Sequence, residues 1–531
     1  MTNSGKPYLE DNSMKRKWST MALMVGLCAT AWGGDFSAAL HQARGCLGHL
    51  PFGERVVAEK RKEEWLVVGL VAWNPGDDDL KQIAKTTTLE SLEVSMVGHG
   101  TEEGWRNLTA LYELQHLSLC FEPEATPEAL KSLSILAKTE RLDLFRCTKM
   151  TAAALVHLKS FPDLRTLKLP DGLDDASLAH ITGLKRLEAL TLRSPTISDE
   201  ALSQLILLPR LAVLDVYQVG PRTTVALGHL QQLESLSVHF CAERTGLIDL
   251  SGWVSLKALT LGDAFAGGPV RLPVNLRRLK VLGWTAEDIK AGWFHLAEPL
   301  PKSLEAVNVR CGCTYGGEDM RRPDLRWLGR LSKLRELTLD EPYKNEIAIV
   351  ADCAHLRALT LTGPTGIVTD EDIRQVAGMK QLESLAIRIS EPEITDAGIS
   401  ALGGLKSLRR LELRWIPKLT PVGLEDIWKL TGLEALSLGL PVETAEGAVE
   451  KALAGIASLV NLQELTLRGK VTDAMLKSLA QLKKLRRLDL SGSQGFTDSG
   501  LAELVKSVPE LKAVAWSYAP AAPKPDAKKG E

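Results

Sequence analysis

Arginine recurs at one position of a pattern that repeats along the chain. The pattern reads Leu-x-x-Leu-x-Leu-x, and its last position is filled in five copies by Arg193, Arg310, Arg388, Arg414 and Arg468. A guanidinium group makes paired hydrogen bonds with a carboxylate or a phosphate. Phe145 and Tyr217 fill the same position in two further copies, and aromatic side chains are common anchors at interfaces. These seven residues are therefore the predicted partner-binding site.

Acidic residues near the arginines leave a second interpretation open. Glu412 lies in the same copy as Arg414, and Asp215 and Asp489 occupy the equivalent place in other copies. If such acids neutralise the arginines, the surface is only a solvated polar face. If they do not, it can dock an acidic group of a partner.

Catalytic and metal-binding patterns are weak by comparison. Cys311 and Cys313 are the only close cysteine pair, and a zinc site would need two further ligands at workable spacing. His295 and His355 do not have that spacing, and we find no phosphate-binding loop, His-Glu-x-x-His or Gly-x-Ser-x-Gly motif. We predict a protein that is not an enzyme and holds no metal or cofactor.

The charge balance bears on the class of partner. The chain has 531 residues, with 64 lysines and arginines against 66 acids and a formal net charge of −2. Dedicated nucleic-acid binders are usually basic. A nucleic-acid partner is therefore not expected, whereas a protein partner or another anionic ligand is.

The elements that must position the arginines follow from the repeat itself. Eighteen copies with a period of about 25 residues run from Leu89 to Leu511. Alternation within Leu-x-Leu has the period of a strand, with apolar side chains on one face and the x residues on the other. A single strand of this kind cannot bury its apolar face, but a stack of them can.

A second element follows most strands. Its start reads Thr or Ser followed by an acid, as in Ser198-Asp199, Thr395-Asp396, Thr472-Asp473 and Thr497-Asp498. The hydroxyl predicts an N-cap, and the acid suits the first turn of a helix. Each unit is expected to be strand, turn, helix and turn, with strands on the concave face and helices on the convex face.

The repeat resembles that of leucine-rich-repeat proteins. Its Thr-Asp-x-Gly-Leu helix starts are similar to the cysteine-containing repeats of F-box-associated substrate receptors and to ribonuclease-inhibitor-like arrays. The resemblance implies an α/β leucine-rich-repeat solenoid over residues 66–516. The usual Asn or Cys after the strand is mostly missing: Cys147 and Cys241 hold that place in two units. Elsewhere it is filled by Gly172, Pro195, Pro342, Pro364 and Pro441.

The ends of the chain predict its organisation and location. Residues 1–31 have the basic start, short apolar run and small-residue exit of a secretory signal, with Met14 as an alternative start. Residues 34–65 are expected to cap the repeats, and 519–531 to form a disordered Pro/Ala/Lys tail. No other segment is long and apolar enough to span a membrane.

Two functions follow from these predictions. The first is a non-catalytic binding scaffold of bacterial type, exported to the periplasm, the cell surface or the medium, that binds a protein or anionic partner through its concave face. The alternative, implied by the resemblance, is an intracellular F-box-like or effector-type substrate receptor of a ubiquitin ligase. The alternative requires an N-terminal signal that is not used.

Segments 311–322 and 441–457 lengthen two units and are expected to be loops.

Overall fold

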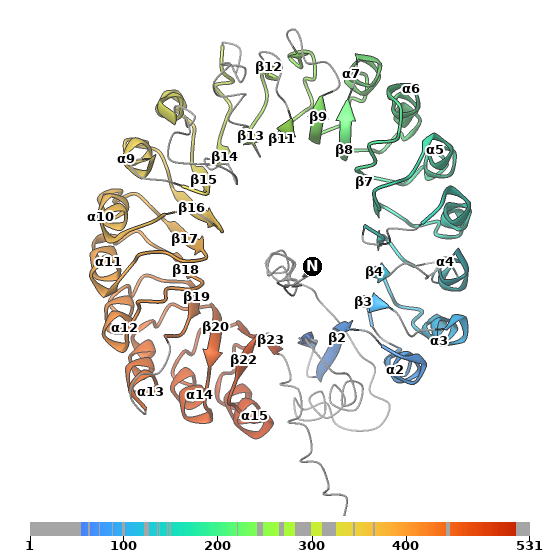
Figure 1. Cartoon of the computed structure of the whole chain (residues 1–531). Helices are drawn as coiled ribbons and strands as arrows, with labels where there is room; N and C mark the ends of the chain where they lie inside the picture. Colours follow the sequence, from blue (N-terminus) through green and yellow to red (C-terminus); the bar gives the residue numbers. More distant parts are fainter. Residues whose placement is uncertain are drawn as a thin grey trace, which may run out of the picture.

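The repeated Leu-x-Leu segments form the strands of one 21-stranded sheet in the computed structural model of the chain (Figure 1). The structure describes residues 55–516 apart from 62–63, 74, 88, 98–100, 122–126, 135, 137, 146, 148–149, 220, 242–247, 265–269, 282–298, 311–324, 343–345, 365–366 and 442–446. The predicted signal, most of the predicted cap, the segment 311–322 and the tail lie outside these residues.

The strands of the large sheet are short and follow one another at the repeat spacing. They are β1 (Arg55–Arg61), β2 (Glu64–Trp73), β3 (Ser91–Val97), β4 (His116–Phe121), β5 (Arg141–Asp143), β6 (Thr166–Leu169), β7 (Ala189–Leu192), β8 (Val213–Val219), β9 (Ser235–Cys241), β11 (Ala258–Ala264), β13 (Arg278–Val281), β14 (Ala306–Arg310), β15 (Glu336–Asp340), β16 (Ala358–Gly363), β17 (Ser384–Ile389), β18 (Arg410–Leu413), β19 (Ala435–Gly439), β20 (Glu464–Lys470), β21 (Arg487–Leu490), β22 (Ser493–Gln494) and β23 (Ala513–Trp516). A separate two-stranded sheet joins β10 (Ile248–Asp249) to β12 (Val270–Arg271).

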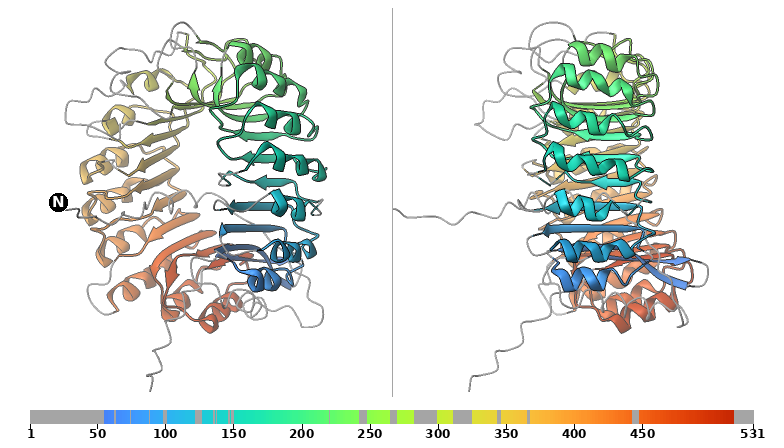
Figure 2. Two further views of the ribbon diagram at one scale, coloured as in Figure 1. Left: turned by 45° about the vertical axis from the view of Figure 1, so that its right-hand side comes forward. Right: turned by 90° about the vertical axis from the view of Figure 1, so that its right-hand side faces the viewer.

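Helices follow most strands and line the outside of the ring, as Figures 1 and 2 show. The α-helices are α2 (Asp77–Ile83), α3 (Glu102–Asn107), α4 (Pro127–Leu133), α5 (Asp175–Ile181), α6 (Asp199–Leu202), α7 (Pro221–Gly228), α9 (Glu346–Ala351), α10 (Asp370–Gly378), α11 (Asp396–Ala401), α12 (Pro421–Ile427), α13 (Ala448–Leu453), α14 (Asp473–Leu479) and α15 (Asp498–Ser507). Short 3-10 helices complete the outer row at Leu108–Ala110, Ala152–Ser160, Ser203–Leu207, Leu325–Arg330, Leu402–Gly404 and Ala454–Ser458.

This arrangement confirms the predicted leucine-rich-repeat solenoid. The core-facing residues of each strand are buried, as in Leu411 and Leu413 with 2% and 0% exposure, while the residue between them is not. Neighbouring strands from β2 onward pair in parallel and in register, so the apolar side chains stack in continuous rows between sheet and helices. One prediction is wrong in part: 448–457, expected to lie in a loop, forms α13 and most of the 3-10 helix after it.

The ends of the sheet meet, which the repeat pattern did not predict. β1 pairs antiparallel with β2, and it also pairs antiparallel with β23, with Val56 opposite Trp516 and Glu59 opposite Ala513. Every strand of the large sheet except β22 therefore has two neighbours, and the sheet closes into a ring. Closure removes the exposed strand edges that an open sheet would present.

The Thr-Asp-x-Gly helix starts form a ladder of hydrogen bonds between successive units. Thr395 caps α11, while its N–H and hydroxyl donate to Asp370 of the preceding unit at 2.8 and 2.7 Å. Burial raises the pKa of Asp370, but hydrogen bonds from Thr395 and from the N–H of Gly398 outweigh burial and leave this pKa below its usual value. A Cβ on Gly398 would lie 2.4 Å from the Asp370 carboxylate. The motif thus needs glycine because the aspartate of the preceding unit occupies the space of a side chain.

The same contact recurs around the ring. The pairs are Asp77 with Thr101, Asp175 with Ser198, Asp396 with Thr420, and Asp473 with Thr497. The predicted N-caps at Ser198, Thr395, Thr472 and Thr497 are confirmed. The aspartate after the caps Thr395 and Thr472 also accepts hydrogen bonds from the cap residue of the next unit, a contact that the helix-start pattern alone does not predict.

Candidate binding face

The inner face of the ring consists of the strand residues that alternate with the buried leucines. Because the helices lie outside, these residues point into the ring (Figure 1). Register is preserved from strand to strand: Arg410, Glu412 and their equivalents on β17 and β19 lie opposite one another. Side chains on successive strands are about 4.8 Å apart, which allows direct contact.

One charged cluster lies on the strands β5 to β9. Arg193 donates through Nε to both Asp215 carboxylate oxygens at 3.0 Å and through Nη2 to Oδ2 at 2.5 Å. His239 Nε2 lies 3.2 Å from Oδ1 of the same carboxylate. The guanidinium of Arg193 also lies 5.6 Å from the centre of the Phe145 ring. We call these four residues the Asp215 cluster.

The electrostatics of this cluster favour the ionised form of Asp215. Burial raises the pKa of Asp215, but the hydrogen bonds from His239 and Arg193 and their charges outweigh it, so this pKa lies below its usual value. Burial raises the pKa of nearby Asp171, and the positive charge of Arg193 offsets only part of this rise. Nε and Nη2 of Arg193 both donate to Asp215, so these two groups are already engaged within the protein.

A second cluster lies on β17 and β18. Arg388 makes a bidentate pair with Glu412, with Nε to Oε1 at 2.9 Å and Nη2 to Oε2 at 2.6 Å. Arg414 Nε reaches the same Oε1 at 3.3 Å. Two guanidinium groups thus share one carboxylate. We call these three residues the Glu412 cluster.

Arg468 lies two strands beyond Arg414. Its Nη1 and Nη2 are 3.3 and 3.2 Å from the two oxygens of Asp489 on β21. Gly439 occupies the equivalent position on the strand between the two arginines, and a Cβ there would lie 2.2 Å from the Arg414 carbonyl oxygen. The inner face therefore has no side chain between Arg414 and Arg468. Trp415, next to Arg414, is 50% exposed and not buried under the neighbouring loop.

The structure brings some predicted site residues together and separates others. Arg193 meets Phe145, and Arg388 meets Arg414 through Glu412. Tyr217 is half-buried on β8, two residues from Asp215. Arg310 ends β14 opposite Asp340, and its side chain lies outside the described part of the structure. The expected pairing of arginines with Glu412 and nearby acids is present, while binding of a partner by these residues stays a prediction.

The distribution of charge distinguishes one arc of the inner face. Among inward strand positions with described side chains, β2 to β15 carry five bases and five acids: Arg141, Lys168, Arg193, Arg278 and Lys280, and Glu93, Asp143, Asp215, Glu336 and Asp340. The strands β17 to β21 carry Arg388, Arg410, Arg414, Arg468 and Arg487 against Glu412, Glu464 and Asp489. We call this second set the basic arc. Arg410 and Arg487 were missed in the sequence, although they stand at the second x of their copies.

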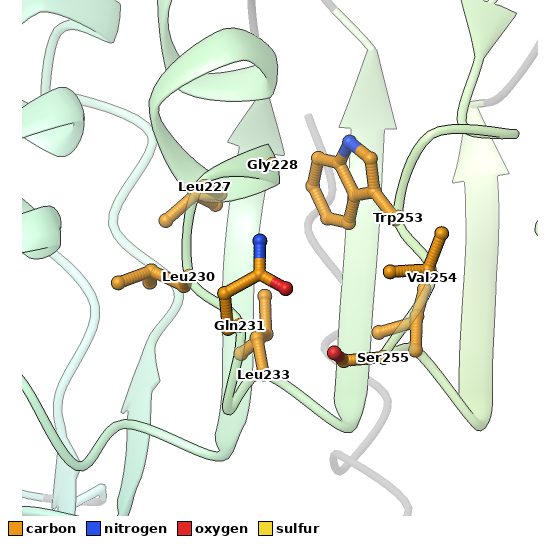
Figure 3. A pocket seen from close by; sticks show the side chains of 9 residues that line it. Leu227, Gly228, Leu230, Gln231, Leu233, Trp253, Val254 and Ser255 are labelled. Carbon is orange, nitrogen blue, oxygen red and sulfur yellow. The ribbon is translucent and has the colours of Figure 1, made fainter.

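Among the described residues between β9 and β13, the short strands β10 and β12 lie on the outer side of the ring, where other units have a helix. Figure 3 shows a shallow hollow beside this region, between the end of α7 and the turn at Trp253. The Trp253 indole packs against Gly228, where a Cβ would lie 3.1 Å from Nε1. The hollow thus marks the junction between helical and non-helical units.

The described residues contain no group of three or more His, Cys, Asp and Glu side chains placed to hold a metal ion. Cys147, which holds the place of the usual Asn or Cys after its strand, is buried, and its thiol donates to the Leu119 carbonyl at 3.4 Å. In the same part of the chain, no helix has the length and apolar character that crossing a bilayer requires.

Comparison with known proteins identifies likenesses in fold. No protein-family model matches the chain, and no curated protein matches it. Solved structures similar to it include that of TLR13 in complex with ssRNA13, at 16% identity and a TM-score of 0.41 over 86% of this chain and 67% of that one. A leucine-rich-repeat protein of Leptospira interrogans matches at 16% identity and a TM-score of 0.27, over 82% and 92% of the two chains. An internalin of Listeria monocytogenes matches at 15% and 0.24, over 91% and 95%. By its own repeat, parallel inner sheet and outer helices, the chain has the leucine-rich-repeat fold.

Proposed function

We propose that the protein is a non-catalytic scaffold that binds an acidic partner through the basic arc of its inner face. The observation that supports this proposal is the excess of arginine on β17 to β21, where Arg388 and Arg414 share the single carboxylate of Glu412. The basic arc has two more arginines than acids among its inward side chains, so it can accept a further anion. Arginines that face a polar, partly exposed surface lose little hydration when they exchange one carboxylate for another.

The structural setting supports binding rather than catalysis. The inner face is a rigid sheet whose polar side chains are held in register, and many modest contacts over such a surface can add up to a specific interface. A purified protein whose hydrolase or transferase turnover is abolished by one inner-face substitution would contradict this proposal.

The direct test is affinity capture with the full-length chain as bait, read by mass spectrometry. The test bait carries Arg388→Gln, Arg414→Gln and Arg468→Gln. A matched control carries Arg374→Gln, Lys477→Gln and Lys506→Gln, which remove three exposed charges from the outer helices α10, α14 and α15. The proposal requires a partner that both the parent and the control retain and the test bait loses. Retention by all three baits would contradict the basic arc as the binding site.

We also propose that the protein is exported, on the strength of the signal-like pattern in residues 1–31. Export predicts that the mature chain begins at Trp32 or Gly34, after cleavage behind the small residue Ala31 or Gly33. Mass spectrometry of the N-terminus of protein isolated from its native cells measures this start directly. An intact Met1 or Met14 would contradict cleavage and favour the intracellular substrate-receptor alternative.

A further inference from the structure

Ring closure limits what can reach the inner face. The ends of the sheet join where Val56–Glu59 of β1 pair with Ala513–Trp516 of β23, and we call this junction the seam. An open solenoid admits a partner from the side, through the gap between its ends. In the closed ring that gap is filled by β1, so the inner face can be approached only through the two mouths.

The width of the ring follows from the strand spacing. All strands of the large sheet except β22 lie in the ring. At a spacing of about 4.8 Å they give a circumference of roughly 95 Å and a distance of roughly 30 Å between opposite backbones. Inward side chains narrow this to roughly 20 Å, because side chains extend about 3–4 Å beyond the Cα positions.

A partner must fit this opening. A compact domain of 100 residues has a radius of gyration of about 13 Å and measures roughly 30 Å or more across, so it cannot enter. An α-helix with its side chains is about 10–12 Å wide, and an extended chain is narrower still. Only a slender segment can lie against the strands from within.

Charge selects the chemistry of that segment. Among inward positions with described side chains, the charges of β2 to β15 balance, whereas the basic arc has five arginines against three acids. Gly439 leaves the inner face without a side chain between Arg414 and Arg468, so an incoming carboxylate can approach both arginines there. Hydroxyl-bearing Ser437 and Thr466 lie in register beside Glu412 and can bond a peptide backbone.

We propose that the partner of the inner face is a slender acidic polypeptide segment, extended or helical, that enters the closed ring through a mouth and lies along the basic arc. The inference rests on the proposed function, since it assumes binding at the inner face. It adds the shape of the partner and the route by which the partner arrives. A globular acidic surface is excluded because it cannot reach Arg388 and Arg414 past the rim.

The test compares one acidic sequence in two forms. The free probe is a fluorescent 20-residue glutamate-rich peptide of about helix width. The bracketed probe holds the same sequence between two globular domains of about 100 residues each, joined by linkers too short to let it loop into the ring. A glutamine-rich peptide of equal length controls for charge, and a single-stranded RNA of similar length controls for other polyanions. Anisotropy titrations measure each dissociation constant.

The seam is controlled with a disulfide across it. Val57 and Ala515 are register partners in β1 and β23, so Val57→Cys with Ala515→Cys can lock the full-length ring. Peptide mapping verifies the new bond, and the reduced form of the same variant is the matched control. If this variant does not fold, Glu59→Cys with Ala513→Cys places the lock at another register pair of the seam.

The proposal predicts that the free probe binds the locked and the parent rings equally, within about twofold, and the bracketed probe at least about tenfold more weakly. Equal binding of both probes would overturn the proposed route. Loss of the free probe on locking would show that entry needs an open seam, and would also overturn it. Absent or charge-independent peptide binding, or tighter binding of the RNA, would overturn the acidic-peptide assignment. Those results would leave the scaffold proposal to the capture experiment, which does not depend on the probe.

Discussion

The Asp215 cluster and the Glu412 cluster place the same residue type at the same position of the repeat, yet they differ in how their charges are used. Arg193 pairs with Asp215, which His239 also contacts, and the ring of Phe145 lies beside its guanidinium group. Arg388 and Arg414 divide one carboxylate between them. In the first arrangement, Arg193 and Asp215 connect side chains from the repeat units of β5, β7, β8 and β9. In the second, two guanidinium groups face one carboxylate, in an arc whose arginines outnumber its acids. Arg388 and Arg414 are therefore stronger binding candidates than Arg193, while Arg468, like Arg193, faces a carboxylate, that of Asp489.

The largest difference is expected in binding of acidic peptides. Replacing Arg388, Arg414 and Arg468 by Gln removes three donors from the basic arc and should weaken binding of a glutamate-rich peptide by roughly 100-fold. Arg193→Gln should change it by less than about twofold, because that guanidinium is committed to Asp215. Titrations of the two variants at one ionic strength measure this contrast. An equal loss in both would remove the distinction between the clusters.

For the free energy of unfolding, the Asp215 cluster should matter more than the Glu412 cluster. Asp215→Asn leaves Arg193 and His239 without their shared acceptor in a half-buried setting, and should lower the free energy of unfolding by about 2 kcal/mol. Glu412→Gln should cost about 1 kcal/mol, because the hydrogen bonds to Glu412 come from Arg388, whereas both Arg193 and His239 bond to Asp215. Urea unfolding of each variant gives these values. A larger loss from Glu412→Gln than from Asp215→Asn would contradict the structural role given to Asp215.

Acid should remove the Asp215 contribution selectively. The pKa of Asp215 is lowered in the folded protein, so its contribution is fully present above its unfolded value of about 3.9 and is lost as the pH falls through the folded pKa. The stability gap between the parent and Asp215→Asn should therefore narrow below about pH 4. Thermal unfolding of both proteins from pH 7 to pH 3 follows the gap. A gap that stays constant over this range would show that Asp215 does not act through its charge.

The smallest expected effect concerns the aromatic partner of Arg193. Phe145→Leu keeps an apolar side chain but removes the ring face, and should cost about 0.5–1 kcal/mol. A double-mutant cycle with Arg193→Gln isolates the contact from the general effect of each substitution. A coupling energy near zero would mean that Phe145 is only a neighbour of Arg193.

The sequence predicted the repeat unit well because its signal is local. Leucine spacing fixes the strands, and Ser198, Thr395, Thr472 and Thr497 cap helices as their positions indicate. Closure of the ring could not be predicted from leucine spacing or helix caps. Residues 55–61 lack the leucine pattern, and the pairing of Val56 with Trp516 depends on the accumulated curvature of all units between them. No single repeat contains that information.

The candidate site was predictable as a set of positions but not as a set of contacts. Alternation placed Arg193, Arg388, Arg414 and Arg468 on the inner face. Which acid each arginine meets depends on the register of adjacent strands and on side-chain direction: Arg388 turns forward to Glu412, and Arg414 turns toward Glu412 on its own strand. Arg410 and Arg487 lie in a third inward column, at the start of their strands, outside the two columns from which the site was predicted.

The central claim is that Glu412 competes with an acidic partner for Arg388 and Arg414. Calorimetric titration of a glutamate-rich peptide into the parent protein and into Glu412→Gln tests it most directly. We expect several-fold tighter binding by Glu412→Gln, with an advantage that shrinks as salt screens the released charges. Equal or weaker binding by this variant, with its fold intact, would contradict the claim.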